Sequence, residues 1–236
     1  MKQIAENIYA VPGMSVGRIY IIVGGDGLAL IDTSFSSQTP QKLEPQLLSM
    51  GYQLSDIHHI LITHAHPDHL GGLAAFQQVT NARTGVHHRD AAVVRGEMLA
   101  PRPQRHQLRG LSRLMLLTPT MTPPPPARVD VEFKGGDRLD DILPGLEVVE
   151  TFGHSPGHVG YWWPEQRIMF CGDVVMHLPW GLVTPIAAFT PDMVAAKRSI
   201  RKIAEMEVDI LCMGHGIPIV GGAAQELQAF AARLGV

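Results

Sequence analysis

The sequence predicts an α/β protein with a four-layer αββα architecture, in which two mixed β-sheets pack face to face and helices cover their outer faces. Two observations support this prediction: strand-like apolar segments occur in two clusters along the chain, and segments with helical spacing follow each cluster. A hydrophobic content of 45% and a charged content of 17% are ordinary for a folded protein. We therefore expect residues 1–236 to form one domain with a sizeable core.

The first cluster of strands occupies the N-terminal third of the chain. Glycine-containing turns separate short β-branched or apolar runs at 8–11, 19–23 and 28–31, which is typical of a β-meander. Thr39 and Pro40 then suit an N-cap and a first helical residue, with Pro45 as an alternative start of the same helix. The remaining elements of this half are a strand at 57–63, a helix at 70–79, a strand at 84–87 and a helix from residue 90 onward.

The second cluster of strands lies in the C-terminal half. Strands are predicted at 131–133, 146–151, 159–163 and 168–171. The segment 190–192 has the composition of a helix start, and apolar residues keep helical spacing behind it up to residue 203. A buried strand at 210–212 and a helix at 225–234 follow.

Residues 95–128 interrupt this alternation of strands and helices. The stretch holds six arginines, one acidic residue and four consecutive prolines, so we interpret it as an insertion closed by a stiff polyproline segment. Arg105, Arg109 and Arg113 follow one another at four-residue steps, which would place them on one face of a helix. A solvated arginine face is the simplest interpretation of this pattern. A lid, a homodimer surface and a dock for an anionic substrate are the alternatives.

A cluster of histidines follows the strand at 57–63. The chain reads His64-Ala65-His66-Pro67-Asp68-His69, and it has twelve histidines in all. His64 and His66 lie two residues apart in extended backbone, so they project to the same side and can share one metal ion. Asp68 and His69 lie beyond the turn and can reach a second ion. Nitrogen and oxygen ligands without a thiolate suit zinc, with iron or manganese as substitutes. In the alternative interpretation Asp68 only caps a helix and the histidines are surface loop residues.

Three further candidate ligands each follow a strand-like run. His154 lies in a turn after one strand, and Asp173 and His215 each follow a buried run through a glycine. A glycine beside a ligand permits close approach of the backbone. Each of the three would be an ordinary turn residue if it stood alone. Together they supply the ligands that the first cluster lacks.

The order His-x-His-x-Asp-His, then His, Asp and His, resembles the metallo-β-lactamase superfamily, and within it the glyoxalase II, lactonase and RNase Z type of site. The resemblance implies that His64, His66 and His154 hold a first metal ion. It also implies that Asp68, His69 and His215 hold a second and that Asp173 bridges both. Asp32 resembles the aspartate that orients a ligand histidine in this family; its alternative is a turn residue at a strand end.

The resemblance implies a dinuclear metal-dependent hydrolase. Two divalent ions about 3.5–4 Å apart can share one water and lower its pKa toward about 7, which supplies a bridging hydroxide as nucleophile. Asp68 is expected to be catalytic, because it can accept the attacking proton and pass it to the leaving group. The substrate is expected to be a small ester, lactone or thioester.

The surroundings of the candidate ligands suggest a substrate pocket. Met176, His177 and Trp180 belong to an apolar stretch that follows Asp173, and they are candidates for an apolar pocket wall, with ordinary packing beneath the sheet as the alternative. His158 could line the same pocket. Cys171 and Cys212 lie inside apolar strand runs and are expected to be inert.

Differences from better-known relatives reduce the number of candidate activities. Class B β-lactamases commonly have a cysteine ligand where this chain has Asp173, and acyl-homoserine-lactone lactonases have a tyrosine where this chain has Met176. Three alternatives to the hydrolase stay open. They are a mononuclear iron oxygenase resembling persulfide dioxygenases, a phosphodiesterase or nuclease resembling RNase Z, and a metal-binding module without catalysis.

Charge and the remaining composition bear on partners. A net charge of −3 does not suggest a nucleic acid as partner, and no apolar run is long enough for a membrane span. Two cysteines cannot form a disulfide framework, and the N-terminal residues lack the pattern of a secretory signal. We therefore expect a cytoplasmic enzyme with a small-molecule substrate.

Overall fold

Two mixed β-sheets face each other in the computed structural model, which describes residues 1–14, 16–115 and 122–236. The seven-stranded sheet runs in the order β1 (Lys2–Ala5), β2 (Ile8–Ala10), β3 (Tyr20–Gly24), β4 (Gly27–Ile31), β5 (Ile57–Leu61), β6 (Arg83–His87) and β7 (Val131–Phe133). The first four strands pair in antiparallel fashion, and β4 to β7 pair in parallel.

The five-stranded sheet has the order β14 (Ile219–Val220), β13 (Ile210–Met213), β10 (Ile168–Gly172), β9 (Val159–Trp163) and β8 (Glu147–Glu150). Its strands β10 and β13 are parallel, and its other neighbours are antiparallel. A separate hairpin pairs β11 (Met176–Leu178) with β12 (Gly181–Val183).

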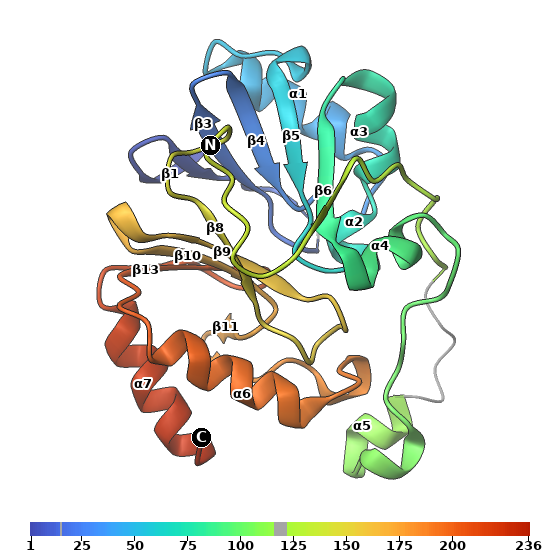
Figure 1. Ribbon diagram of the computed structural model, residues 1–236, viewed down its shortest axis with the longest axis vertical. Coiled ribbons are helices and arrows are strands. Elements are labelled where there is room, and N and C mark those ends of the chain that lie inside the picture. Colours follow the sequence, from blue (N-terminus) through green and yellow to red (C-terminus); the bar gives the residue numbers. More distant parts are fainter. Residues whose placement is uncertain (15, 116–121) are drawn as a thin grey trace.

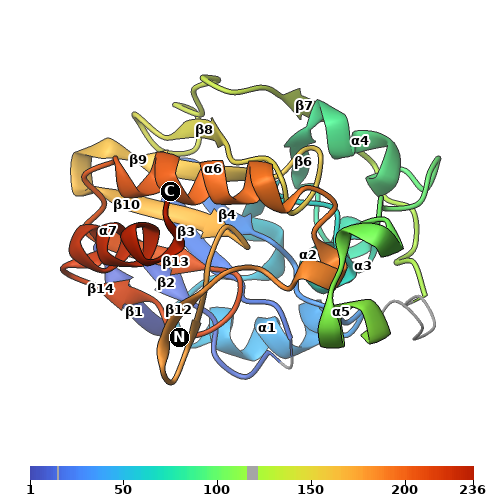
Figure 2. The same cartoon turned by 90° about the horizontal axis from the view of Figure 1, so that it is seen from below.

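Helices cover the outer faces of both sheets (Figure 1). The seven-stranded sheet carries α1 (Thr39–Leu48), α3 (Leu73–Val79) and α4 (His88–Val94). On the five-stranded sheet lie α6 (Met193–Ala204) and α7 (Ala223–Leu234), which cross in front of its strands in Figure 2. Shorter helical turns are α2 (Pro67–Leu70), α5 (Gly110–Met115), η1 (Leu54–Asp56), η2 (Arg105–Gln107), η3 (Pro164–Gln166) and η4 (Ala187–Phe189). The predicted four-layer αββα arrangement is confirmed.

Strand β4 shows why the central strands are apolar throughout. Ala29 and Ile31 belong to the core between the sheets, whereas Leu28 and Leu30 belong to the core beneath α1 and α3. Successive side chains point to opposite faces of a strand, so a strand covered on both faces needs apolar residues at every position. None of the helices in the described part of the chain combines the length and apolar character that a membrane span requires.

The helix predicted at 70–79 is two helices, α2 and α3, with Gly71 and Gly72 between them. A side chain at Gly71 would collide with the carbonyl of Phe35, and one at Gly72 with the carbonyl of Thr33. The two glycines therefore serve close packing against the loop that follows β4, a contact that helical periodicity does not report.

The start of α1 also differs from the prediction. Gln38 is the N-cap, Thr39 is the first helical residue, and Pro45 lies inside the helix. Pro45 removes one intrahelical hydrogen bond. The helix nevertheless continues, because Leu43 and Leu47, four residues apart, are both buried in the core beneath it.

The continuous arginine face predicted in the 95–128 insertion is wrong. Arg105 lies in the short turn η2, Leu108 is extended, and α5 begins only at Gly110. A continuous helix is interrupted here, because Leu108 has extended backbone and Gly110, the residue at which α5 begins, has a positive φ of 54°, outside the right-handed helical region. Part of the insertion, 116–121, lies outside the described residues.

Candidate metal centre

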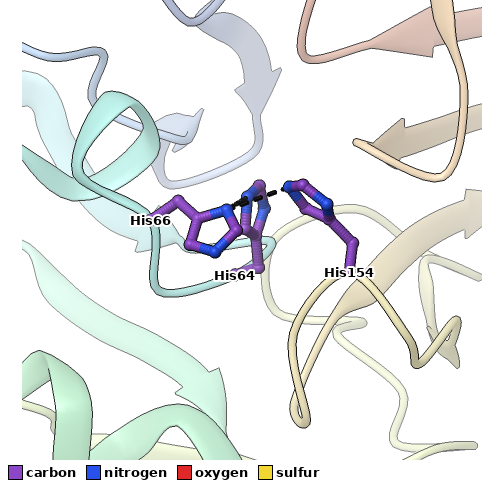
Figure 3. A group of neighbouring side chains, drawn as sticks. All are labelled: His64, His66 and His154. Carbon is purple, nitrogen blue, oxygen red and sulfur yellow. Dashed lines mark hydrogen bonds between the residues drawn. The ribbon is translucent and has the colours of Figure 1, made fainter. Parts of the chain in front are cut away.

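Three histidine rings meet where two loops from different parts of the chain approach each other (Figure 3). His64 follows β5, His66 is the N-cap of α2, and His154 lies in the turn between β8 and β9. The Nδ1 atom of His66 lies 3.1 Å from Nε2 of His64 and 2.9 Å from Nε2 of His154. We call these three residues the first trio. Burial, followed by the neighbouring His154, lowers the pKa of His66 to about 3, so this ring stays neutral.

Hydrogen bonds orient the outer rings of the first trio. The Thr63 hydroxyl donates to the Asp32 carboxylate, so it accepts from Nδ1 of His64 at 3.1 Å. The Thr190 hydroxyl likewise donates to the Ile186 carbonyl and accepts from Nδ1 of His154 at 3.0 Å. Both histidines therefore keep a lone pair on Nε2, facing Nδ1 of His66. A proton on Nδ1 of His66 can be donated to only one of the two Nε2 atoms. A metal cation would be bound by all three nitrogens.

A second trio consists of Asp68, His69 and His215. The Nε2 atom of His215 lies 3.0 Å from Oδ2 of Asp68, and Nε2 of His69 lies 3.9 Å from the same oxygen. Burial raises the pKa of Asp68, but the adjacent His69 and the hydrogen bond from His215 outweigh it and lower the value to about 2. Burial opposes protonation of His215, but its hydrogen bonds to Asp173 and Asp68 raise its pKa to about 9. Asp68 is thus held as an anion.

Asp173 lies between the two trios. Its Oδ2 atom is 3.4 Å from Nε2 of His154 and 3.3 Å from Nε2 of His215, and its Oδ1 atom is 3.4 Å from Nε2 of His69. Within the described part of the chain, Nε2 of His69 and Oδ1 of Asp173 are buried without a hydrogen-bond partner of proper geometry. Buried polar atoms are normally satisfied, so two orphaned atoms facing one another indicate an absent ligand.

The donor set fits two metal cations. The ligand atoms within each trio, and those of His64, His69 and Asp173, lie within 4.8 Å of one another. Burial opposes protonation of His69, but Asp173, Asp32 and Asp68 outweigh it and raise its pKa well above the usual range. The negative charge of these carboxylates favours a proton on Nε2 of His69, and it favours a metal cation at that atom for the same reason. The geometry therefore brings together all seven ligands expected from the sequence.

Asp32 lies behind the second trio, as the resemblance implied. Its Oδ2 atom accepts a hydrogen bond from Nδ1 of His69 at 2.7 Å, and Oδ1 accepts the backbone N–H of Thr63 at 2.8 Å. These contacts leave Nε2 of His69 as its free ring nitrogen and tie the strand end after β4 to the strand end after β5.

His158 supports Asp173 and does not line a pocket. Its ring is fully buried, Nδ1 donates to the Thr151 hydroxyl at 2.8 Å, and Nε2 accepts the backbone N–H of Asp173 at 3.0 Å. The sequence contains no signal for this role or for that of Thr190, because each depends on a partner from a distant segment. Cys171 and Cys212 are free and buried, and burial raises the pKa of both thiols, as expected of inert residues.

A cavity of about 190 Å³ opens beside His215. It is lined by Val11, Gly13, Met14, Val16, Gly17, Arg18, Gly214, His215 and Gly216. Arg18 donates from Nε to the carbonyl of Gly216 at 2.9 Å and thereby supports the loop that carries His215. A larger cavity of about 260 Å³ is lined by residues such as His59, Arg83 and Arg138 and contains none of the candidate ligands.

The structure places the three predicted pocket residues around a hairpin. Met176 is buried in β11, and the backbone N–H of His177 donates to the carbonyl of His215 at 3.1 Å. Trp180 lies at the hairpin turn and is 77% exposed. None of the three lines the cavity beside His215, so their part in a substrate pocket stays a prediction.

An αββα fold with one trio of histidines and one Asp/His trio, built from loops of both sheets, defines a class of metal-binding proteins. The family model of the metallo-β-lactamase superfamily matches residues 13–215, and the chain belongs to this family.

Curated relatives and a solved structure agree with this membership. The chain is 28% identical over 191 residues to the probable metallo-hydrolase YflN of Bacillus subtilis, covering 75% of this chain and 69% of the relative. It is 27% identical over 171 residues to a hydroxyacylglutathione hydrolase of Rhodospirillum rubrum, covering 72% of this chain and 52% of the relative. The metallo-β-lactamase family protein TTHA1429 of Thermus thermophilus has the same fold, with a TM-score of 0.76 and 23% identity over 99% of this chain and 81% of that one.

Proposed function

We propose that this protein is a dinuclear metal hydrolase that cleaves a small ester, lactone or thioester. The family membership and the resemblance to metallo-hydrolases support a metal-dependent hydrolase. The observation that carries the dinuclear part is the position of Asp173, whose carboxylate reaches His154 of the first trio and both histidines of the second.

Each trio would hold one ion, and Asp173 would contact both. Zinc is our choice of metal, because all seven candidate ligands are imidazoles or carboxylates, with no thiolate, and such nitrogen and oxygen donors suit it. Iron and manganese accept the same donors. When bound, the two ions would activate a water as nucleophile and polarise the substrate carbonyl.

Asp68 is the residue to which we assign proton transfer. Its pKa of about 2 keeps it ionised at neutral pH, so it can accept the proton of the attacking water. Asp173 is nearly fully buried, whereas Asp68 is only partly buried and faces His215 at the cavity. Asp68 can therefore carry the accepted proton to the leaving oxygen or sulfur, while Asp173 stays a fixed anion between the trios.

The cavity supports a small substrate. About 190 Å³ accommodates a short acyl or lactone group beside His215, and the largely polar surface of the cavity, which includes Arg18, suits the oxygen atoms of such a group. The likeness to a hydroxyacylglutathione hydrolase supports a thioester as one member of this class. The expected cytoplasmic location stays a prediction, and a homodimer surface stays one of the alternatives for residues 95–128.

A combined metal and substrate assay tests this function. Purified protein would be loaded with zinc, iron or manganese in turn and assayed against lactones, thioesters, phosphoesters and nitrocefin. Hydrolysis of a carbonyl ester, lactone or thioester with two bound ions is the expected result. One iron per chain with oxygen uptake would establish a dioxygenase instead. Preferred cleavage of phosphodiesters would establish a nuclease, and tight metal binding without turnover a binding module.

A further inference from the structure

The carboxylate of Asp90 lies between the loops that carry the first trio. It is 1% exposed and belongs to the first turn of α4, outside the set of candidate ligands. Its Oδ2 atom accepts the backbone N–H of Ala65 at 3.0 Å and the hydroxyl of Ser155 at 2.6 Å. Its Oδ1 atom accepts the backbone N–H of Gly157 at 2.7 Å. One side chain thus bonds both the loop of His64 and His66 and the loop of His154.

Two further contacts of the same helical turn cross between the sheets. Nε2 of His87 lies 3.3 Å from the Glu150 carboxylate at the end of β8, and the guanidinium of Arg89 stacks on Phe152 at 4.5 Å. Both partners lie in the segment that leads to His154. The first turn of α4 therefore packs on the His154 loop over several residues, and Asp90 is its point of contact with both loops.

A structural role confined to α4 does not explain Asp90. The N-cap of α4 is His87, whose Nδ1 accepts the backbone N–H of Arg89 at 3.3 Å. The hydrogen bonds of the Asp90 side chain all come from other segments. A Cβ at Gly157 would meet the Asp90 carboxylate and backbone at about the same close range, so the turn after His154 is packed directly on this residue.

We propose that Asp90 is a positioning residue that sets the distance between the His64–His66 pair of one sheet and His154 of the other, and thereby the metal affinity of the first trio alone. This inference rests on the proposed dinuclear site. The second trio has a separate contact between the sheets, in which Arg18 bonds Gly214 and Gly216 on either side of His215. Loss of Asp90 should therefore weaken one site and spare the other.

The test uses two background variants, each of which keeps only one of the two trios complete. His215→Ala removes a ligand of the second trio only, and His66→Ala removes a ligand of the first trio only. Asp90→Asn is then added to each, because an amide keeps the shape but turns a donor toward N–H and O–H groups that need an acceptor. The Kd for zinc is measured by competition with a chromophoric chelator. In the His215→Ala background the Kd should rise by about 10–100-fold, the usual effect of losing a residue that orients metal ligands. In the His66→Ala background it should stay unchanged.

Asp130→Asn is the matched control. Asp130 also accepts a backbone N–H, that of Thr84 at 2.8 Å, but touches neither ligand loop, so both affinities should stay unchanged. Should Asp90→Asn fail to fold, Ser155→Ala removes one of the same hydrogen bonds and must produce the same one-sided loss. An equal loss of zinc affinity in both backgrounds, or no loss in either, overturns the positioning role of Asp90 while leaving the dinuclear site intact. Single-site parents that bind no zinc overturn the dinuclear site itself, and the positioning role with it.

Discussion

The Nδ1 atom of His66 and the Nε2 atom of His154 lie 2.9 Å apart, although the two residues belong to loops of different sheets. The first trio is therefore assembled only when the sheets are packed against each other. The second trio is assembled in the same way, because Asp68 and His69 follow the seven-stranded sheet and His215 follows the five-stranded sheet. Metal binding at either trio should consequently be linked to the packing of the two sheets.

Metal removal should destabilise the protein. Because both trios join the two sheets, each ion binds the folded chain and not the unfolded one. An ion present at about 100 times its Kd adds about 2.7 kcal/mol to the free energy of unfolding. We expect close to two divalent ions per chain by elemental analysis and a clear fall in Tm after chelation, restored by adding metal. A ratio that stays at one after full loading would reject the dinuclear site.

Replacement of Asp68 by Asn should separate proton transfer from metal binding. The variant keeps the size and one oxygen ligand but loses the basic charge. We expect turnover to fall by about 10²–10⁴, the usual contribution of a positioned acid or base. The assay must run at saturating zinc with the bound metal measured, and the exposed Asp140→Asn serves as the control that leaves turnover unchanged. Near-normal turnover at full occupancy would show that Asp68 is only a ligand, and His177 would be tested next.

Substitution of Gly214 should disturb both trios at once. A Cβ at this position would overlap Oδ1 of Asp173 and the ring of His69. Gly214→Ala should therefore raise the Kd for zinc by at least about tenfold, the lower end of the effect seen when ligands lose their orientation. Gly25→Ala is the matched control, because a Cβ at Gly25 meets no atom within 4 Å. Equal zinc affinities for the two variants would mean that the loop before His215 shifts to accommodate the added Cβ without loss of metal binding.

The pH dependence of stability should contain a contribution from His59, which lies away from the trios. Burial lowers its pKa below the ordinary value of 6.5; Asp141 opposes this shift, and Arg83 adds to it. A base whose pKa is lowered on folding holds fewer protons in the folded chain, so folding becomes less favourable as pH falls from about 6.5 through the lowered pKa.

His59→Gln removes this titration. The free energy of unfolding, measured by urea denaturation, should fall more steeply for the parent than for the variant between about pH 7.5 and about pH 5.5. Comparing the two chains cancels the loss of metal at low pH, which affects both. Parallel curves for the two proteins would contradict the lowered pKa of His59.

Local patterns in the sequence were sufficient to predict the layers of the fold and the candidate ligands. Alternating and continuous apolar runs identify strands that are buried on one or both faces. The ligands could be found because His64, His66, Asp68 and His69 lie within one short loop. His154, Asp173 and His215 each stand at a strand end beside a glycine. Both kinds of signal depend on residues that are neighbours in the chain, so a single sequence displays them.

The residues that hold the candidate ligands in place could be identified only from the tertiary structure. Thr190, which the sequence suggests only as part of a helix start, accepts a hydrogen bond from His154, and His158 holds the backbone of Asp173. Asp90 bonds two loops that lie 25 and 67 residues away from it. The break between α2 and α3 likewise depends on a loop of another strand. Such contacts form when the two sheets pack together, and their energy depends on distances in space that no spacing along the chain records.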